Sequence, residues 1–545
     1  MKKTTIISLV WILILFFSQS GMAQAAESSS QNLFLYGLLA VVIMIFLYMV
    51  VQVSDNLLAI EAKHSGAAKT GKNFSLFPKW SEIIAPKLPA YVADEPVKVL
   101  RRGHDILLEG AATKEIATAS VTRFAIQPPN FVGMSPIPKV LVEVGDSVKA
   151  GDQIMFDKKR PEIKYSSPVS GEVVAINRGQ KRSIAEVIIL ADKEQEFRSY
   201  EALDLEKGTR AELVDYLLES GVWPMIRQRP FDVVADPQEA PQNIFISTFD
   251  SAPLAPDLNL VVKGKEEAFQ KGLDVLNKLT DGKVHLGLSA RGEEAPSSAF
   301  TQAKGVALHW FHGKHPAGNV GVQIHHIAPV SATDKAWVLG VQEVITLGTL
   351  FAEGRFDTER IVVLAGDQLK EAKYVRTYQG ANVGELVKNN LANDHVRIIA
   401  GDALSGKKKD TDGFLNFFDD QVTVIAEGDD FEMFGWLLPS YARPSISKTF
   451  PSTFLSGLKF KVNTNTHGEK RAFVVTGQYE SVLPMDVYPQ HLMKSILVND
   501  FERMEGLGIY ELSEEDIALC EFACTSKQPL QKILREGLDT MREQG

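Results

Sequence analysis

An uncharged apolar run, LFLYGLLAVVIMIFLYMVVQV from Leu33 to Val53, most constrains what the first part of this chain can fold into. A helix needs about 20 such residues to cross the hydrocarbon core of a bilayer. The run has no polar face, and this argues against a buried helix of a globular domain. The sequence therefore predicts a transmembrane helix over residues 33–53.

The first 25 residues have the pattern of a secretion signal. A basic start, MKK, precedes an apolar stretch at residues 6–17, and small residues stand at Ala23 and Ala25. This pattern is typical of a signal peptide, which is cleaved, but an uncleaved segment would form a first transmembrane span. Both possibilities stay open for residues 1–25.

The charges that flank residues 33–53 predict the side of the membrane. Residues 20–32 contain no lysine or arginine, whereas Lys63, Lys69 and Lys72 follow the apolar run. By the positive-inside rule, the rest of the chain is expected in the cytoplasm, at the inner (cell) membrane, with one span or with two. Residues 54–96 contain four prolines in their second half and are predicted to be a linker.

The composition excludes one class of partner and one kind of framework. With 58 basic and 68 acidic residues the chain is mildly acidic, so nucleic acid is not an expected partner. Its only two cysteines, Cys520 and Cys524, argue against a disulfide framework and suit a reducing compartment.

Two short segments of alternating strands follow the linker. Residues 140–156 (VLVEVGDSVKAGDQIMF) and 163–179 (IKYSSPVSGEVVAINRG) carry Gly-Asp and Pro-Val-Ser-Gly turns. The pair resembles the half-motifs of a biotinyl/lipoyl-type barrel-sandwich hybrid. In that fold a lysine of the intervening hairpin can carry the cofactor, but Lys158 and Lys159 lack flanking methionines, and a structural use of the fold is predicted.

The middle of the chain shows a βαβ pattern. Strands are predicted at residues 243–250, 258–264 and 283–289, with a helix over residues 265–280. Neither G-x-G-x-x-G after a strand nor G-x-x-x-x-G-K-[ST] occurs, so the sequence offers no evident seat for a nucleotide or flavin phosphate.

Two groups of side chains are possible metal ligands, and packing roles are favoured for both. The histidines of residues 309–326 do not share one helical or strand face, so zinc is disfavoured; they are His309, His312, His315, His325 and His326. Cys520 and Cys524 are expected on one face of a helix that starts at the capping sequence SEED, Ser513 to Asp516. Because iron–sulfur clusters normally take four cysteines, this pair is predicted to be core packing.

Several long motifs together resemble the NqrA family, a subunit of the sodium-translocating NADH:quinone oxidoreductase. The resemblance covers residues 97–545 and rests on FVGMSPIPKVLVEVGDSVKAGDQIMFDKKRPEIKYSSPVSGEVVAINRGQKR, WPMIRQRPFDVV, HPAGNVGVQIHHIAPVSATDKAWVLGVQEVITLGTLFAEGRF, FEMFGWLLPS and YESVLPMDVYPQHLMKSILVND. Family members begin near VLRRGHDILLEG and have no membrane segment. Residues 1–96 therefore suggest a lineage in which a peripheral protein of the complex gained its own tether.

The resemblance implies a multidomain α/β and α+β fold. The expected domains are a barrel-sandwich hybrid at residues 97–195, a Rossmann-like domain at 196–356, a β-grasp (SLBB) domain at 357–445 and a mostly helical part at 446–545. In related electron-entry subunits a glycine-rich loop seats FMN, and ESGVWPMIRQRPFD, residues 219–232, stands in its place here. EGAAT, which ends at Thr113, does not match the threonine motif that carries covalent FMN in membrane subunits of the complex.

The resemblance also implies a role without catalytic, metal-binding or cofactor-binding residues in this chain. The complex oxidises NADH, reduces quinone to quinol and exports sodium ions, as a translocase of six subunits. FAD, FMN, riboflavin, the iron–sulfur cluster and quinone are expected in the five other subunits, and this chain is expected to be structural or close to the quinone. The alternative left open is a stand-alone, membrane-tethered β-grasp protein that binds a small ligand.

Overall fold

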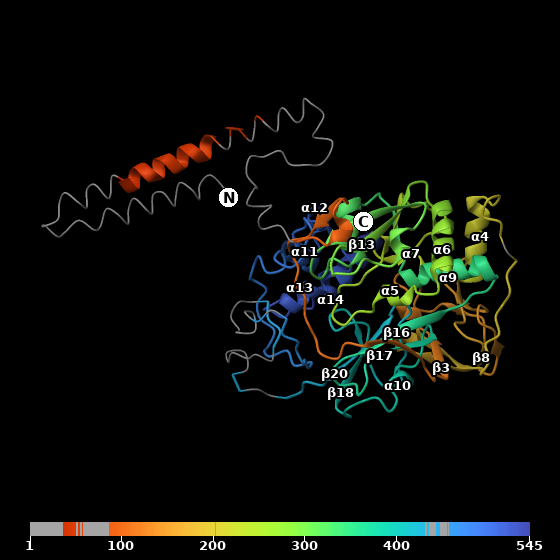
Figure 1. Cartoon of the computed structure of the whole chain (residues 1–545). Coiled ribbons are helices and arrows are strands. Elements are labelled where there is room, and N and C mark those ends of the chain that lie inside the picture. Colours follow the sequence, from red (N-terminus) through yellow and green to blue (C-terminus); the bar gives the residue numbers. More distant parts are fainter. Residues whose placement is uncertain are drawn as a thin grey trace. The chain divides into compact units, whose positions relative to one another are not determined.

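The computed structural model describes residues 36–50, 53–54, 57, 87–201, 203–430, 433–434, 443–446, 455 and 457–544 (Figure 1). The chain divides into two compact units, Met1–Lys87 and Leu88–Gly545. In the first unit, residues 36–50 are helical and their side chains are exposed. In the described part of the chain, no helix is both long and apolar enough to cross a membrane. The span predicted at residues 33–53 stays a prediction, and residues 1–25 lie outside the described residues.

The second unit contains the predicted barrel-sandwich domain, built from two small sheets. One has the order β3 (Arg123–Ile126), β9 (Ile184–Ala191), β8 (Gly171–Arg178), β5 (Ser147–Val148), and the other β4 (Lys139–Val140), β6 (Gln153–Phe156), β7 (Lys164–Ser166). Val173 and Ile189 pair across β8 and β9 and are fully buried. Gly171, in the predicted turn, has φ +156°, and a Cβ there would lie 2.0 Å from the Leu190 carbonyl oxygen. Only glycine fits this position.

A seven-stranded sheet forms the Rossmann-like domain. Its order is β1 (Val97–Val99), β14 (Val306–His312), β13 (Lys283–Ser289), β12 (Asn243–Ser247), β15 (Ala336–Val338), β10 (Arg227–Arg229), β11 (Val233–Val234). The first five strands in this order, β1, β14, β13, β12 and β15, run parallel to one another. β10 and β11 are added antiparallel at the β15 edge. β1 comes from residues that the sequence assigns to the barrel domain, so the chain adds an edge strand here before it enters the barrel.

Helices cover both faces of this sheet. Phe245 of β12 packs against α8 (Val320–Ile327), whereas Ile244 and Ile246 belong to the core that α6 (Glu266–Leu279) and α9 (Val341–Glu353) share. Successive side chains of a strand point to opposite faces, so α8 lies on one face and α6 and α9 on the other. The helices α4 (Arg210–Ser220), α6 and α9 lie side by side (Figure 1).

One predicted strand in this domain is wrong. Residues 258–261 form the short helix α5 (Leu258–Val261), not a strand. The side chain of Asp257 accepts a hydrogen bond from the Asn259 backbone N–H and caps this helix. The apolar run alone could not distinguish a buried strand from a buried helical turn, and the cap decides for the helix.

The β-grasp domain contributes a six-stranded sheet. Its order is β19 (Lys407–Lys409), β18 (Val396–Ala400), β20 (Gln421–Ala426), β16 (Glu359–Ala365), β17 (Lys373–Tyr378), β2 (Thr113–Thr118). β2 also precedes the barrel in sequence, and it extends this sheet parallel to β17. The segment before the barrel therefore links the Rossmann-like and β-grasp sheets.

The C-terminal part was expected to be mostly helical over residues 446–545, but the described residues between 446 and 488 form turns and loops, and helices begin only at Pro489. It contains α11 (Pro489–Leu497), α12 (Phe501–Gly506), α13 (Glu514–Ala523) and α14 (Leu530–Gln544). Their buried faces form a second core, which includes Leu492, Leu519 and Leu534. This core is distinct from the one that α6 and α9 share.

Candidate functional site

A cavity of about 240 Å³ lies at the carboxyl ends of β12 and β15. The chain passes from β12 outward to β13 and β14, and then returns to place β15 on the other side of β12. Open α/β sheets bind ligands in the crevice at such a reversal of strand order. This position makes the cavity the candidate binding site of the domain.

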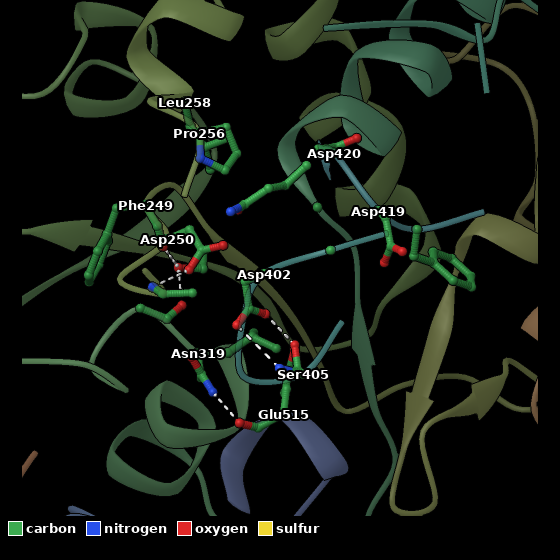
Figure 2. Close-up of a pocket in the computed structure, with 18 of the residues that line it drawn as sticks. Phe249, Asp250, Pro256, Leu258, Asn319, Asp402, Ser405, Asp419, Asp420 and Glu515 are labelled. Carbon is green, nitrogen blue, oxygen red and sulfur yellow. Dashed lines mark hydrogen bonds between the residues drawn. The ribbon is translucent and has the colours of Figure 1, made fainter. Parts of the chain in front are cut away.

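Three domains contribute side chains to the cavity (Figure 2). The loop after β12 and the amino ends of α8 and α9 come from the Rossmann-like domain. The same domain also supplies β10 and the loop after β14, and the β-grasp domain and α13 contribute further residues. The carboxylates and the nearby basic side chains of the lining are Asp250, Asp402, Asp419, Asp420, Glu515, Arg227 and His315.

The five carboxylates fall into two groups by their partners. Asp420 accepts a hydrogen bond from Arg360 at 3.2 Å, and Glu515 pairs with Arg229 at 3.1 Å. Among the described residues, no such cation pairs with the other three. Asp250 accepts from the Ala252 backbone N–H at 2.8 Å, and Asp402 accepts from the Leu404 N–H at 2.6 Å and from the Ser405 side chain.

The protein environment raises the pKa of Asp250, Asp420 and Glu515. Burial raises the pKa of Asp250 to about 6, and the nearby Asp402 charge adds to the effect. Asp250 nevertheless remains exposed to solvent and lines the cavity. Burial also raises the pKa of Asp420 and of Glu515 to about 7, although arginines oppose the shift at both. The cavity therefore gains negative charge as the pH rises through 6 to 7.

A buried arginine fixes α13 at the cavity. Arg229 of β10, only 2% exposed, pairs with Asp232 at 3.3 Å, with Glu515 at 3.1 Å and with Asp516 at 3.6 Å. Asp516 also accepts from the backbone N–H and the hydroxyl of Ser513, which completes the capping box predicted from SEED. This network holds the amino end of α13, and with it Glu515, in place.

The structure disperses the five clustered histidines among different partners. His309 contacts His285, His312 donates from Nδ1 to the Ala290 carbonyl oxygen, and His315 contacts Ser251. His325 and His326 bind Glu511 and the Pro484 carbonyl oxygen, respectively. Within the described residues, no three histidine, cysteine or acidic side chains lie close enough to share a metal ion. Only His315 of this group reaches the cavity.

Both cysteines lie in the core of the C-terminal helices, as predicted. Cys520 is 0% exposed and Cys524 is 5% exposed. The Cys524 sulfur lies 2.9 Å from the Tyr479 hydroxyl oxygen. Cys520 lies within α13, whereas Cys524 is the C-cap that follows its last residue, so the two cysteines do not both lie on the helix as expected. Burial raises the pKa of the Cys520 thiol well above its usual range, which makes it a poor nucleophile.

Bulky side chains fill the segment that replaces the glycine-rich loop. Trp223 is fully buried, donates from Nε1 to the Ala235 carbonyl oxygen at 2.9 Å and packs edge-to-face on Trp337. Elsewhere, Lys158 and Lys159 lie between β6 and β7, away from the cavity. Thr113 is the first residue of β2 and donates its backbone N–H to the Ala372 carbonyl oxygen.

The carboxylates of the cavity were missed from the sequence. Asp402, Asp419 and Asp420 stand in ordinary turn sequences, and more than a hundred residues separate them from Asp250. The only available signal was the position of Asp250 at the end of the strand predicted over residues 243–250, where ligand-binding side chains are common in α/β sheets.

The fold defines a modular, multidomain protein, with a barrel-sandwich domain, a parallel α/β sheet, a β-grasp sheet and a helical end in one chain. Three family models match it: the NqrA N-terminal barrel-sandwich hybrid domain at residues 98–192, the NqrA second alpha/beta domain at 208–356 and the NQRA C-terminal domain at 361–410.

Relatives that are covered over almost their whole length identify the family. The NqrA protein of the Na(+)-translocating NADH-quinone reductase of Yersinia pestis is 38% identical over 450 residues, which cover 82% of this chain and 99% of the relative. The corresponding protein of Saccharophagus degradans is 39% identical with the same coverage. The chain belongs to the NqrA family of the Na(+)-translocating NADH-quinone reductase, which confirms the resemblance. A solved NAD+-reducing [NiFe]-hydrogenase chain aligns with a TM-score of 0.33, 10% identity and coverage of 64% of this chain and 67% of that chain, too low to inform function.

Proposed function

We propose that this chain is one component of a membrane complex that oxidises NADH, reduces quinone to quinol and exports sodium ions. Its membership of the NqrA family, with 99% of each relative covered, is the observation that carries the proposal. In this assignment the chain is part of an enzyme through its complex, and five other subunits are its partners.

Within the complex the chain carries no redox centre and has a structural or quinone-side role. Three features support this. The cavity at the strand ends is lined by carboxylates, which would repel the phosphate of FMN, and so its residues do not fit a flavin nucleotide. Trp223 fills the segment that replaces the glycine-rich loop. The two cysteines supply half of the ligands that an iron–sulfur cluster normally takes. NADH, FAD, FMN, riboflavin, the cluster and quinone are assigned to the partner subunits.

The body of the chain is placed on the cytoplasmic side of the inner (cell) membrane. The support is the lysine distribution around residues 33–53, with Lys63, Lys69 and Lys72 on one side and no basic residue at 20–32 on the other. The N-terminal segment would then tether the protein directly.

Affinity purification of the C-terminally tagged chain from native membranes in mild detergent tests the assembly. Five further subunits and sodium-dependent NADH:quinone activity are expected to copurify, whereas recovery of the chain alone would refute the assembly. Absorption spectra with iron and flavin analysis test the role. The isolated chain should be colourless while the complex shows flavin and iron–sulfur absorption, and stoichiometric flavin or iron on the isolated chain would refute a role without redox centres.

A further inference from the structure

Six exposed basic side chains lie on the barrel-sandwich domain, although the whole chain has a net charge of −10. They belong to three segments, residues 135–139, 157–160 and 178–184. We call them the basic patch, and they are Lys139, Lys158, Lys159, Arg178, Lys181 and Arg182. Among the described residues, none of the six forms an ion pair with a carboxylate.

Two hydrogen bonds bring the three segments of the basic patch together. The Ser135 backbone N–H donates to the Asp157 carboxylate at 3.3 Å, where the turn between β6 and β7 begins. The next residue, Pro136, accepts from the Ile184 backbone N–H at 3.1 Å, where β9 begins after its turn from β8. Residues 135–139 therefore contact both hairpins, and the basic patch is continuous across them.

The neighbouring carboxylates do not neutralise the basic patch. Within the three segments the only carboxylate is Asp157, which is 0% exposed and accepts hydrogen bonds from the backbone N–H groups of Ser135 and Lys159. Glu186 of β9 is half-buried and accepts a hydrogen bond from the Asn177 side chain at 2.8 Å. The charge that these segments expose to solvent is therefore positive.

The turn between β8 and β9 presents two of these cations from an uncommon backbone conformation. Lys181 and Arg182 have φ values of 52° and 63°, in the left-handed region that residues other than glycine rarely adopt. The Arg178 guanidinium donates to the Arg182 carbonyl oxygen at 3.3 Å and supports the turn. Backbone conformations of this kind are concentrated at functional sites, so this turn is a candidate for one.

The composition of the basic patch favours a lipid surface over a protein partner. Four of its six residues are lysines, and the large apolar side chain exposed beside them is Ile137, which is 40% exposed. None of the large, exposed apolar side chains described for the barrel-sandwich domain is aromatic. Protein interfaces are depleted in lysine and enriched in aromatic residues. An anionic bilayer surface, in contrast, attracts clustered lysines and arginines without requiring a complementary shape.

We propose that the basic patch docks onto the anionic lipid headgroups of the membrane to which the chain is tethered, with Ile137 at the lipid surface. The six cations supply the attraction, and the tether keeps the bilayer within their reach. The inference rests on the membrane placement proposed above but not on the assembly with other subunits, because the chain alone carries both the tether and the basic patch.

Lysine footprinting of the full chain in lipid nanodiscs tests the inference. The discs contain phosphatidylcholine alone, or two parts phosphatidylcholine to one part phosphatidylglycerol, and neither lipid carries a reactive amine. In the anionic discs we expect the four lysines of the basic patch to react with an N-hydroxysuccinimide ester about threefold or more slowly. The exposed Lys278 of α6 and Lys532 of α14 should react equally in both discs. Added salt should restore the reactivity of the patch lysines, because it screens their attraction to the headgroups.

A pair of neutralising substitutions measures the contribution of charge. Since each basic side chain near an anionic surface strengthens binding about fivefold, K158Q/K159Q should weaken docking about 30-fold. Lys139 and Lys181 should then regain their reactivity in the anionic discs. The matched control K278Q/K532Q removes the same charge outside the basic patch and should leave the protection unchanged. All four substituted side chains are exposed, so both variants are expected to fold, and circular dichroism checks this.

The outcomes separate the alternatives. Equal reactivity of the patch lysines in the two kinds of disc overturns the inference, and so does equal protection of the wild type and K158Q/K159Q in the anionic discs. Protection that arises only in the purified complex, and equally in phosphatidylcholine, overturns it in favour of an acidic protein partner. Copurification of the chain with phosphatidylcholine discs reports on the tether alone, so a failure of the membrane placement is distinguishable from a failure of the basic patch.

Discussion

Removal of Arg229 should destabilise the attachment of α13 more than any surface change in this part of the chain. The guanidinium is 2% exposed and pairs with Asp232, Glu515 and Asp516 at 3.1–3.6 Å, and the Asp516 side chain is 0% exposed. In R229M an apolar chain of similar length fills the space but leaves buried carboxylates without a cation. Breaking a buried pair in this way costs about 3–5 kcal/mol, which lowers the folding equilibrium constant by a factor of roughly 10² to 10³·⁵.

The pH dependence of R229M gives a second, independent signature. Burial already raises the pKa of Glu515 to about 7 and raises that of Asp516, and loss of the arginine removes a charge that opposes both shifts. A folded-state pKa above the unfolded value means that stability is full at low pH and is lost as the pH rises through the folded pKa. The destabilisation should therefore be larger at pH 8 than at pH 5.5.

Urea unfolding of the full chain, followed by far-ultraviolet circular dichroism at both pH values, measures these effects. The control is R503M, because Arg503 is 75% exposed in its pair with Asp500 and its loss should change the free energy of unfolding by less than about 1 kcal/mol. The double variant R229M/D516N should recover part of the loss, since it removes the most deeply buried unpaired carboxylate. A cost below about 1 kcal/mol, or an equal cost at both pH values, would show that the network does not clamp α13.

Three further predictions concern packing and charge. G348A should lower the free energy of unfolding by about 1–3 kcal/mol in urea titrations, because a Cβ at this position would lie 1.7 Å from the Ala268 carbonyl oxygen of α6. The control G506A should be close to neutral, since a Cβ at Gly506 would have no neighbour within 4 Å. C520S places a hydroxyl in an apolar core and should cost about 1–3 kcal/mol, and the native thiol should not react with a thiol reagent until the chain unfolds. D250N should raise the melting temperature at pH 8 but not at pH 4. The folded-state pKa of Asp250, about 6, exceeds its ordinary value, so the fold disfavours the charged carboxylate that is present at pH 8. An equal shift of the melting temperature at both pH values would contradict this.

Local chemistry made parts of the fold predictable. The SEED sequence at Ser513 predicted a helix start because its side chains satisfy free N–H groups within four residues, and the capping box is present. The turn at Gly171 followed from its backbone requirement. Apolar strands at residues 243–250 and 283–289 were predicted because parallel strands are buried on both faces.

Features that depend on distant residues could not be predicted in this way. Val97–Val99 pairs with β14, about two hundred residues further along, and nothing in the short strand specifies that partner. Residues 258–261 are apolar enough for either a strand or a helix, and only the cap at Asp257 decides. The cavity is the extreme case, because its carboxylates come from three domains and each is unremarkable in its own segment.

The positions of these carboxylates explain why the cavity differs from a phosphate site on the same kind of sheet. Helix amino ends at the strand tips normally attract phosphate, because their free N–H groups and the helix dipole favour an anion. Here the protein supplies the anions itself. Asp420 lies at the start of α9, within reach of the Gln342 side chain, and Asp516 lies so close to Gly321 of α8 that a Cβ there would be 2.2 Å from it.

Asp420 belongs to the β-grasp domain and Asp516 to α13. Because these carboxylates lie at the amino ends of two helices of the Rossmann-like domain, their contacts also join the three parts of the chain. Both carboxylates would repel a phosphate at these helix ends, and their withdrawal would leave the buried Arg360 and Arg229 each with one carboxylate partner fewer. Asp250 and Asp402 lie outside this arrangement, since neither has an arginine in the described chain. Like Asp419, they line the cavity without an ion-pair partner among the described residues.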